Sequence, residues 1–270
     1  MNNIAEYRMG NSPWLHAAAC SALGTRSYQQ DFVVLLTERD GLMAAVCDGM
    51  GGLKGGEVAS RTAAMLLYDD YQEQRPMDIP RFLRAEAAKM DERVAALTGE
   101  DGRLLKGGTT VVSAVIQGNL LHWLSVGDSR IYLLRGERMQ AVTRDHNYRT
   151  VLNEALRAGR ITRQEYEREE KTPKAEALVS FLGMRGLKMA DVGTLPTALM
   201  PGDIVLLCSD GLYKSLDESQ ILAMIRDNDV DMQIAADRLV DMALAFRQGG
   251  HDNTSVVLVK YEGSQGGMAG

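Results

Sequence analysis

Short, mostly apolar stretches recur along this chain, and polar or glycine-containing turns separate them. Such runs are typical of buried β-strands. We expect strands at 16–20, 32–37, 42–47, 109–116, 120–125, 130–134, 139–142, 202–208 and 254–260. Two pairs of these segments are joined by tight turns, at 117–119 and 135–138, as in β-hairpins. Strands that follow one another in this way predict antiparallel sheets.

A second pattern, with apolar residues three and four positions apart, predicts helices between the strands. We expect them over 57–74, from an N-cap at Asp78 to about Leu97, over 216–226 and over 231–247. The order of elements indicates an α+β fold in which two antiparallel sheets pack together under covering helices. We interpret residues 1–263 as a single domain.

Residues 147–183, called the insert below, differ from the rest of the chain. They begin as a charged, helical stretch in which Gly159 separates two short helices, and the run 165–171 is typical of a solvated helix face. We therefore expect the insert to lie outside the core. The glycine-rich residues 264–270 are predicted to be a flexible tail.

The acidic balance of the chain limits its function. The 270 residues carry a formal net charge of -6, which argues against a nucleic-acid partner. No stretch approaches the ~18 apolar residues of a membrane span. Cys20, Cys47 and Cys208 are widely spaced, which argues against a zinc site or a disulfide framework and favours buried thiols in a reducing cytoplasm. An acidic protein would also repel a phosphorylated substrate unless bound cations reversed the local charge.

Five acidic residues lie where a predicted strand meets a turn. Asp48 and Asp210 each follow an apolar run and precede a glycine, and Asp31, Asp128 and Asp252 lie beside other turns. Hard divalent cations take several carboxylate oxygens as ligands, so these residues are candidate metal ligands. Taken singly, each is equally typical of a turn residue. Sequence spacing alone leaves their convergence in space open.

The chain lacks the motifs of two nucleotide-binding sites and of serine hydrolases. A dinucleotide fingerprint that starts at Gly49 needs Gly or Ala at position 54, which is Lys54. A P-loop lysine follows a glycine and precedes Ser or Thr, and Lys54 does neither, so we interpret it as a charge on the rim of the site. Neither Ser129 nor Ser209 lies in the Gly-x-Ser-x-Gly turn of serine hydrolases.

Seven motifs occur in an order and at separations that match a known family. They are Arg26 with Asp31, Asp48-Gly49-Met50-Gly51-Gly52, Gly108-Thr109-Thr110, Gly127-Asp128-Ser129-Arg130, Asp145-His146, Ser209-Asp210-Gly211 and Asp252-Asn253-Thr254. From about Ser12 to Tyr261, the chain resembles the metal-dependent serine/threonine protein phosphatases of the protein phosphatase 2C (PP2C, or PPM) family in their compact bacterial form. The resemblance implies a four-layer αββα sandwich, with the insert as a flap and a two-ion Mn²⁺ or Mg²⁺ centre at one end.

The resemblance also implies the roles of individual residues. In its metal site, Asp48 would bridge two ions, and the carbonyl of Gly49 would bind the first of them. Asp210 and Asp252 would bind the second ion, and Asp31 would hold waters of the first. Asp128 would share a weaker third ion with Asp210. Arg26 would bind the substrate phosphate, since its planar guanidinium suits a bidentate contact. Catalysis would rest on Arg26, Asp48, Asp210 and Asp252.

The implied activity is hydrolysis of phosphoserine and phosphothreonine on proteins by a metal-activated water, which reverses a Ser/Thr protein kinase. A cognate kinase is therefore an implied partner. Met50 replaces a His of animal relatives, which leaves proton donation to a metal-bound water or to His146. Two alternatives stay open: a catalytically silent regulatory module of the same fold, because Gln29-Gln30 and residues 172–183 depart from the family pattern, and a related phosphatase that acts on partner-switch antagonists.

Overall fold

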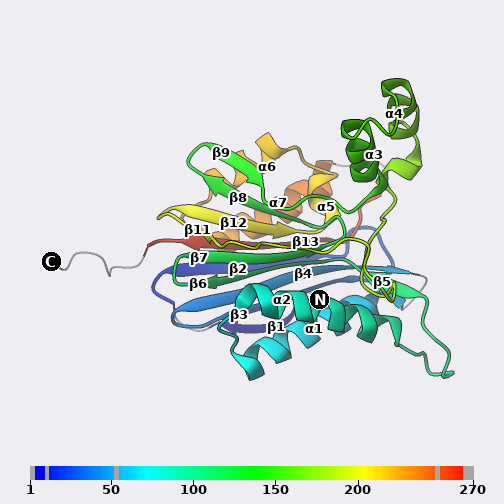
Figure 1. Cartoon of the computed structure of the whole chain (residues 1–270). Coiled ribbons are helices and arrows are strands. Elements are labelled where there is room, and N and C mark those ends of the chain that lie inside the picture. The colour runs from blue at the N-terminus through cyan, green and yellow to red at the C-terminus, as the bar shows by residue number, and fades with distance from the viewer. Residues whose placement is uncertain (1–3, 10–11, 52–54, 247–249, 264–270) are drawn as a thin grey trace.

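Two β-sheets lie face to face in the computed structural model, which describes residues 4–9, 12–51, 55–246 and 250–263 (Figure 1). The first sheet has the order β1 (Ile4–Met9), β3 (Asp31–Thr37), β4 (Gly41–Gly51), β6 (Val111–Gln117), β7 (Leu120–Val126) and β10 (Asp191–Val192), while β5 (Gly107–Thr109) pairs with β4 and β11 (Thr197–Ala198) with β7. The second sheet has the order β2 (Leu15–Ala22), β13 (Thr254–Tyr261), β12 (Asp203–Cys208), β8 (Arg130–Arg135) and β9 (Arg138–Ala141).

Helices cover both outer faces of this pair of sheets. Helices α1 (Gly55–Gln74) and α2 (Ile79–Ala95) pack on the first sheet, and α5 (Asp210–Tyr213), α6 (Glu218–Arg226) and α7 (Met232–Phe246) pack on the second. The four-layer αββα architecture is therefore confirmed. Asp78 caps α2 as predicted, because its side chain accepts a hydrogen bond from the backbone N–H of Arg81. Within the described ranges, no helix is both long and apolar enough to cross a membrane.

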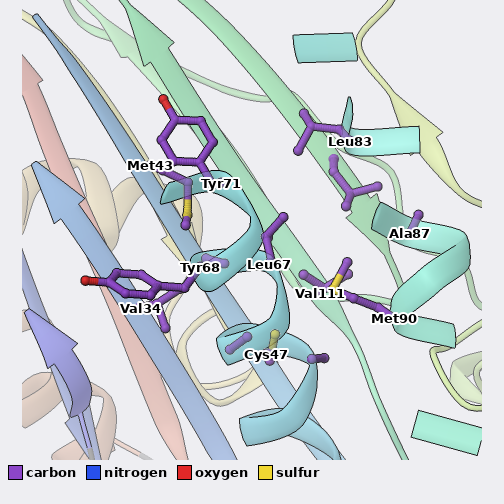
Figure 2. Packing of buried hydrophobic residues seen from close by; sticks show 14 of the residues in the cluster. Val34, Met43, Cys47, Leu67, Tyr68, Tyr71, Leu83, Ala87, Met90 and Val111 are labelled. Carbon is purple, nitrogen blue, oxygen red and sulfur yellow. The ribbon is translucent and has the colours of Figure 1, made fainter. Parts of the chain in front are cut away.

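The layers are held together by three apolar clusters, one at each interface between layers. Along β3, Val34 and Leu36 face the helices of the first sheet, while Val33 and Leu35 face the second sheet. Figure 2 shows the cluster between the first sheet and its helices, where Val34 lies beside Tyr68 and Met43 beside Tyr71 of α1. Burial on both faces explains why this strand is a continuous apolar run rather than an alternating one.

Two strands of the first sheet are among the differences between the structure and the sequence prediction. Strand β4 does not end at Asp48 but continues to Gly51, because Gly49 to Gly51 pair with β5. Asp48 therefore lies within a strand. Strand β1, which we did not predict, pairs with β3 in parallel, so the first sheet is not wholly antiparallel.

The insert stands away from the sandwich at the end of the molecule where β5 lies (Figure 1). It contains the two predicted helices, α3 (Tyr148–Arg157) and α4 (Arg163–Glu170), and a 3-10 turn, η1 (Pro173–Glu176). Where the insert ends, the buried carboxylate of Asp91 on α2 accepts hydrogen bonds from the backbone N–H groups of Gly183, Met184 and Gly186. This contact fixes the returning chain to the sandwich. The tail predicted at 264–270 lies outside the described residues.

Candidate metal centre

Four of the predicted acids meet at one end of the two sheets. Asp31 on β3 and Asp48 on β4 are direct neighbours in the antiparallel pairing. Asp210 follows β12 and Asp252 precedes β13, and these two strands are also paired. A Cβ atom on Gly211 would lie 2.2 Å from the carbonyl oxygen of Asn253, so only glycine lets the Asp210 and Asp252 loops approach this closely.

A cavity of about 540 Å³ opens between these loops and the insert. Its lining consists of Arg26, Gln30, Asp48, Gly49, Met50, Gly51, Thr110, Asp128, Glu176, Leu178, Phe181, Asp210, Lys214, Asp252 and Asn253. Six of the seven predicted site residues are thus brought to one cavity. The seventh, Asp31, does not line it and is only 2% exposed.

Asp31 and Asp48 concentrate negative charge in a buried position. Burial raises the pKa of Asp31 to about 7, and repulsion from Asp210 and Asp252 adds to this effect, although a hydrogen bond that Ser209 donates over 2.7 Å opposes it. Burial and then the charge of Asp31 raise the pKa of Asp48 well above its usual value. The Oδ1 atom of Asp31 has no hydrogen-bond partner among the described residues.

The Gly108-Thr109-Thr110 motif holds the backbone of Asp48. Thr110 accepts a hydrogen bond from the N–H of Asp48 at its hydroxyl over 3.0 Å, and its own N–H donates to the Asp48 carbonyl over 2.9 Å. The Thr109 hydroxyl donates to the same carbonyl. Next along the strand, a Cβ on Gly49 would lie 2.2 Å from the carbonyl oxygen of Gly56, so the chain is tightly packed there. These contacts hold the backbone of Asp48 in place and so restrict the position of its carboxylate.

The unusual pair Gln29-Gln30 has structural partners. Gln29 donates to the hydroxyl of Ser21 and accepts from the N–H of Asp31. Gln30 donates from its side chain to the carbonyl of Gly51, which places it on the cavity wall. Both side chains thus support the loop that carries Asp31.

Two internal cations contact the remaining acids. Nη2 of Arg26 lies 2.6 Å from Oδ2 of Asp252, and Nζ of Lys214 lies 2.5 Å from Oδ2 of Asp210. Burial acts to lower the pKa of Lys214, but attraction from Asp210 and Asp128 outweighs it and raises that pKa, so the ammonium is charged at neutral pH.

Asp128 is held by a separate network behind the cavity. Burial, and next the charge of Asp210, raise its pKa to about 7. The phenol of Tyr213 donates a hydrogen bond to the backbone carbonyl of Asp128 over 2.9 Å, and the guanidinium of Arg130 stacks 3.6 Å from the centre of the Tyr213 ring.

His146 is fully buried and does not line the cavity. The two ring nitrogens of His146 contact the N–H of Gly127 and the carboxylate of Asp191, so it positions the turn before Asp128.

The acids offer hard oxygen donors, which suit Mg²⁺ or Mn²⁺. Asp31 and Asp48 repel each other and make no ion pair among the described residues, and Oδ1 of Asp31 is unpartnered, so this part of the site lacks compensating positive charge. Over the described part of the chain, however, no three Asp, Glu, His or Cys side chains are grouped closely enough to hold an ion as they stand. Because Arg26 engages Asp252, binding an ion at Asp252 requires Arg26 to exchange partners, whereas Lys214 contacts Asp210 at Oδ2 alone.

Sequence reasoning missed Lys214 and did not single out Leu178 and Phe181 within the predicted flap. Leu178 and Phe181 line the wall formed by the insert, and a Cβ on Gly108 would lie 2.5 Å from the Phe181 ring. Lys214 follows Asp210 by four residues, which is the spacing that brings two side chains together on a helix. That spacing was the signal that could have identified Lys214.

Comparison with known proteins gives consistent matches over most of the chain. The family model described as protein phosphatase 2C matches residues 21–242. Two relatives are a serine/threonine phosphatase of Listeria monocytogenes, 30% identical over 82% of this chain and 85% of its own, and protein phosphatase PhpP of Streptococcus pneumoniae, 31% identical over 87% and 92%.

Two solved structures have the same fold and similar sequences. The serine/threonine phosphatase of S. agalactiae superposes with a TM-score of 0.79 at 25% identity and covers 92% of this chain and 100% of its own. The catalytic domain of the phosphatase PstP, solved in complex with two manganese ions, has a TM-score of 0.71 at 27% identity, over 92% and 98%. The resemblance seen in the motifs is confirmed: the chain belongs to the protein phosphatase 2C family of metal-dependent serine/threonine protein phosphatases.

Proposed function

We propose that this protein phosphatase hydrolyses phosphoserine and phosphothreonine on proteins and so reverses a Ser/Thr protein kinase. The observation that carries the proposal is one cavity in which Asp48, Asp128, Asp210 and Asp252 lie together with Arg26. A phosphomonoester carries negative charge, and only added cations make such an acidic cavity attractive to it. The relatives described above are named as phosphatases, which favours the enzyme over a catalytically silent module.

Mn²⁺ or Mg²⁺ would be held by this set of oxygen donors. Asp48, the carbonyl of Gly49, Asp210 and Asp252 would be the direct ligands of the two ions, and Asp31 would hold waters of the first. When bound, two such ions supply an activated water and neutralise the phosphoryl oxygens. The structure of PstP with two manganese ions supports this stoichiometry.

Arg26 would change partners when the substrate binds. Its side chain is 57% exposed and pairs with Asp252, so its guanidinium can turn to two phosphoryl oxygens once Asp252 has another ligand. A bidentate contact would orient the phosphate in the cavity. Leu178 and Phe181 of the insert would cover the apolar part of the peptide beside the phosphorylated residue and exclude bulk water.

We also propose a cytoplasmic location and a cognate kinase among the substrates. The cysteines Cys20, Cys47 and Cys208 are free thiols, as suits a reducing compartment. The kinase follows from the reaction, because a protein phosphatase needs an enzyme that supplies phosphorylated Ser and Thr.

The test is hydrolysis of a small aryl phosphate and of a phosphothreonine peptide after treatment with EDTA. We expect no turnover without metal, and restored turnover with Mn²⁺ or Mg²⁺. Folded protein that binds these ions and hydrolyses neither substrate would contradict the proposal. Such a result would support the regulatory module instead.

A further inference from the structure

Lys214 is placed between two carboxylates of the cavity. Its Nζ atom lies 2.5 Å from Oδ2 of Asp210 and 3.9 Å from Oδ2 of Asp128. The Asp128 side chain is 8% exposed, that of Asp210 15%, and that of Lys214 34%. The ammonium is therefore partly withdrawn from water and faces two acids at once, unlike an ordinary surface ion pair.

The local fold holds Lys214 in this position. It directly follows the single helical turn of α5, which begins at Asp210, so the two side chains lie one turn apart. The backbone N–H of Lys214 donates to the Asp210 carbonyl over 3.0 Å. The neighbouring Tyr213 donates to the Asp128 carbonyl. One short segment thus carries one of the acids, holds the backbone of the other and supplies the cation between them.

We propose that Lys214 is a positioning residue whose ammonium group neutralises the Asp128–Asp210 pair in place of a further divalent ion, so that the centre holds two ions rather than three. This inference rests on the proposed two-ion function. A cation tethered to the same turn acts at an effective concentration on the order of millimolar or above. It therefore displaces any divalent ion that binds the pair weakly.

The arrangement still leaves room for the two ions of the reaction. The ammonium contacts Asp210 at Oδ2, and a carboxylate has a second oxygen that can bind a metal. Asp128 is left with a partner that is permanent rather than exchangeable. Lys214 would thus hold Asp210 in place and keep the charge of the cavity independent of a loosely bound ion.

The test counts manganese ions bound by the full chain after equilibrium dialysis against millimolar Mn²⁺, with metal and protein measured on the same sample. We expect two ions in the wild type. Lys214→Met, which has similar length and no charge, should bind three. Lys214→Arg, which keeps the charge, should bind two. The double variant Lys214→Met/Asp128→Asn should also return to two, because one ligand of the new ion is gone.

Three ions in the wild type, or two in Lys214→Met, would overturn the inference and leave the proposed function intact. A wild-type protein that binds no manganese would overturn both. Circular dichroism checks that the variants fold, and Lys214→Gln replaces Lys214→Met if that variant does not. A merely structural lysine would alter stability without changing the number of bound ions.

Discussion

Arg26 and Asp252, which are 226 positions apart in the chain, are joined by a contact of 2.6 Å between Nη2 and Oδ2. The residue expected to bind phosphate and a residue expected to bind metal thus neutralise each other. Oδ2 of Asp252 holds Arg26 and its Oδ1 accepts a hydrogen bond from the N–H of Asn253, so each of the two residues is fully available for its own ligand only when the other is released. Metal binding and phosphate binding should therefore favour one another.

Replacing Arg26 by Ala should separate these two roles. We expect kcat/KM for a phosphothreonine peptide to fall about 10–100-fold, mostly through KM, as for the loss of a charge-assisted contact. Manganese should bind at least as tightly as before, because Asp252 loses its competing partner. Steady-state kinetics and calorimetric titration with Mn²⁺ measure the two effects. Arg26→Lys, which keeps the charge without the planar fork, should be intermediate; an unchanged kcat/KM in Arg26→Ala would contradict the assignment.

Asp210→Asn and Asp252→Asn should instead abolish turnover by weakening metal binding. An amide is nearly the same size as a carboxylate but lacks the negative charge that hard cations require. We expect loss of activity at low Mn²⁺ with partial recovery at high Mn²⁺, measured on an aryl phosphate. Asp101→Asn, at an exposed loop position far along the chain from both, is the matched control. Wild-type activity and metal affinity in Asp210→Asn would rule out that residue as a ligand.

The strands and helices could be predicted because their patterns are local. The run Phe32 to Thr37 is apolar because β3 is buried on both faces, and Asp78 caps α2 through a bond to a residue three positions away. The parallel pairing of β1 with β3 could not be predicted, since Ile4–Met9 is a short edge segment and the next strand along the chain, β2, belongs to the other sheet.

The candidate site could be predicted in part, for a related physical reason. Motifs identified the acids, but their convergence depends on the pairing of β3 with β4 and of β12 with β13. The ion pair between Arg26 and Asp252 was missed because it spans nearly the whole chain. The role of Asp91 was also hidden, since its partners are backbone N–H groups, which carry no sequence signal.

The anchor at Asp91 predicts a link between α2 and the insert. Asp91→Asn replaces one of two acceptor oxygens by an NH₂ group that faces backbone donors, and the loss should destabilise the protein by about 1–3 kcal/mol. We also expect the substitution to raise KM for a phosphopeptide more than KM for an aryl phosphate, because Phe181, which lies just before the anchor, lines the cavity. Thermal unfolding and kinetics on both substrates test this. Glu92→Gln, at the exposed neighbouring position, should change neither quantity.

Glu86 on α2 predicts how stability depends on pH, away from the metal centre. Its side chain is buried, and burial together with a hydrogen bond to Asp70 raises its pKa from 4.5 to about 7. Between these pH values the folded protein binds more protons than the unfolded chain. The free energy of unfolding therefore falls as pH rises from about 4.5 to 7, and it stays lower above that range.

Glu86→Gln cannot ionise, so it should remove this fall. Relative to the wild type, we expect the variant to gain on the order of 2–3 kcal/mol in stability between pH 4.5 and pH 8. Urea unfolding of both proteins in EDTA at each pH gives the difference, in which groups common to both cancel. Glu73→Gln, an exposed position on α1, should show no such gain. A stability difference between Glu86→Gln and the wild type that is the same at both pH values would mean that Glu86 ionises alike in the folded and unfolded states.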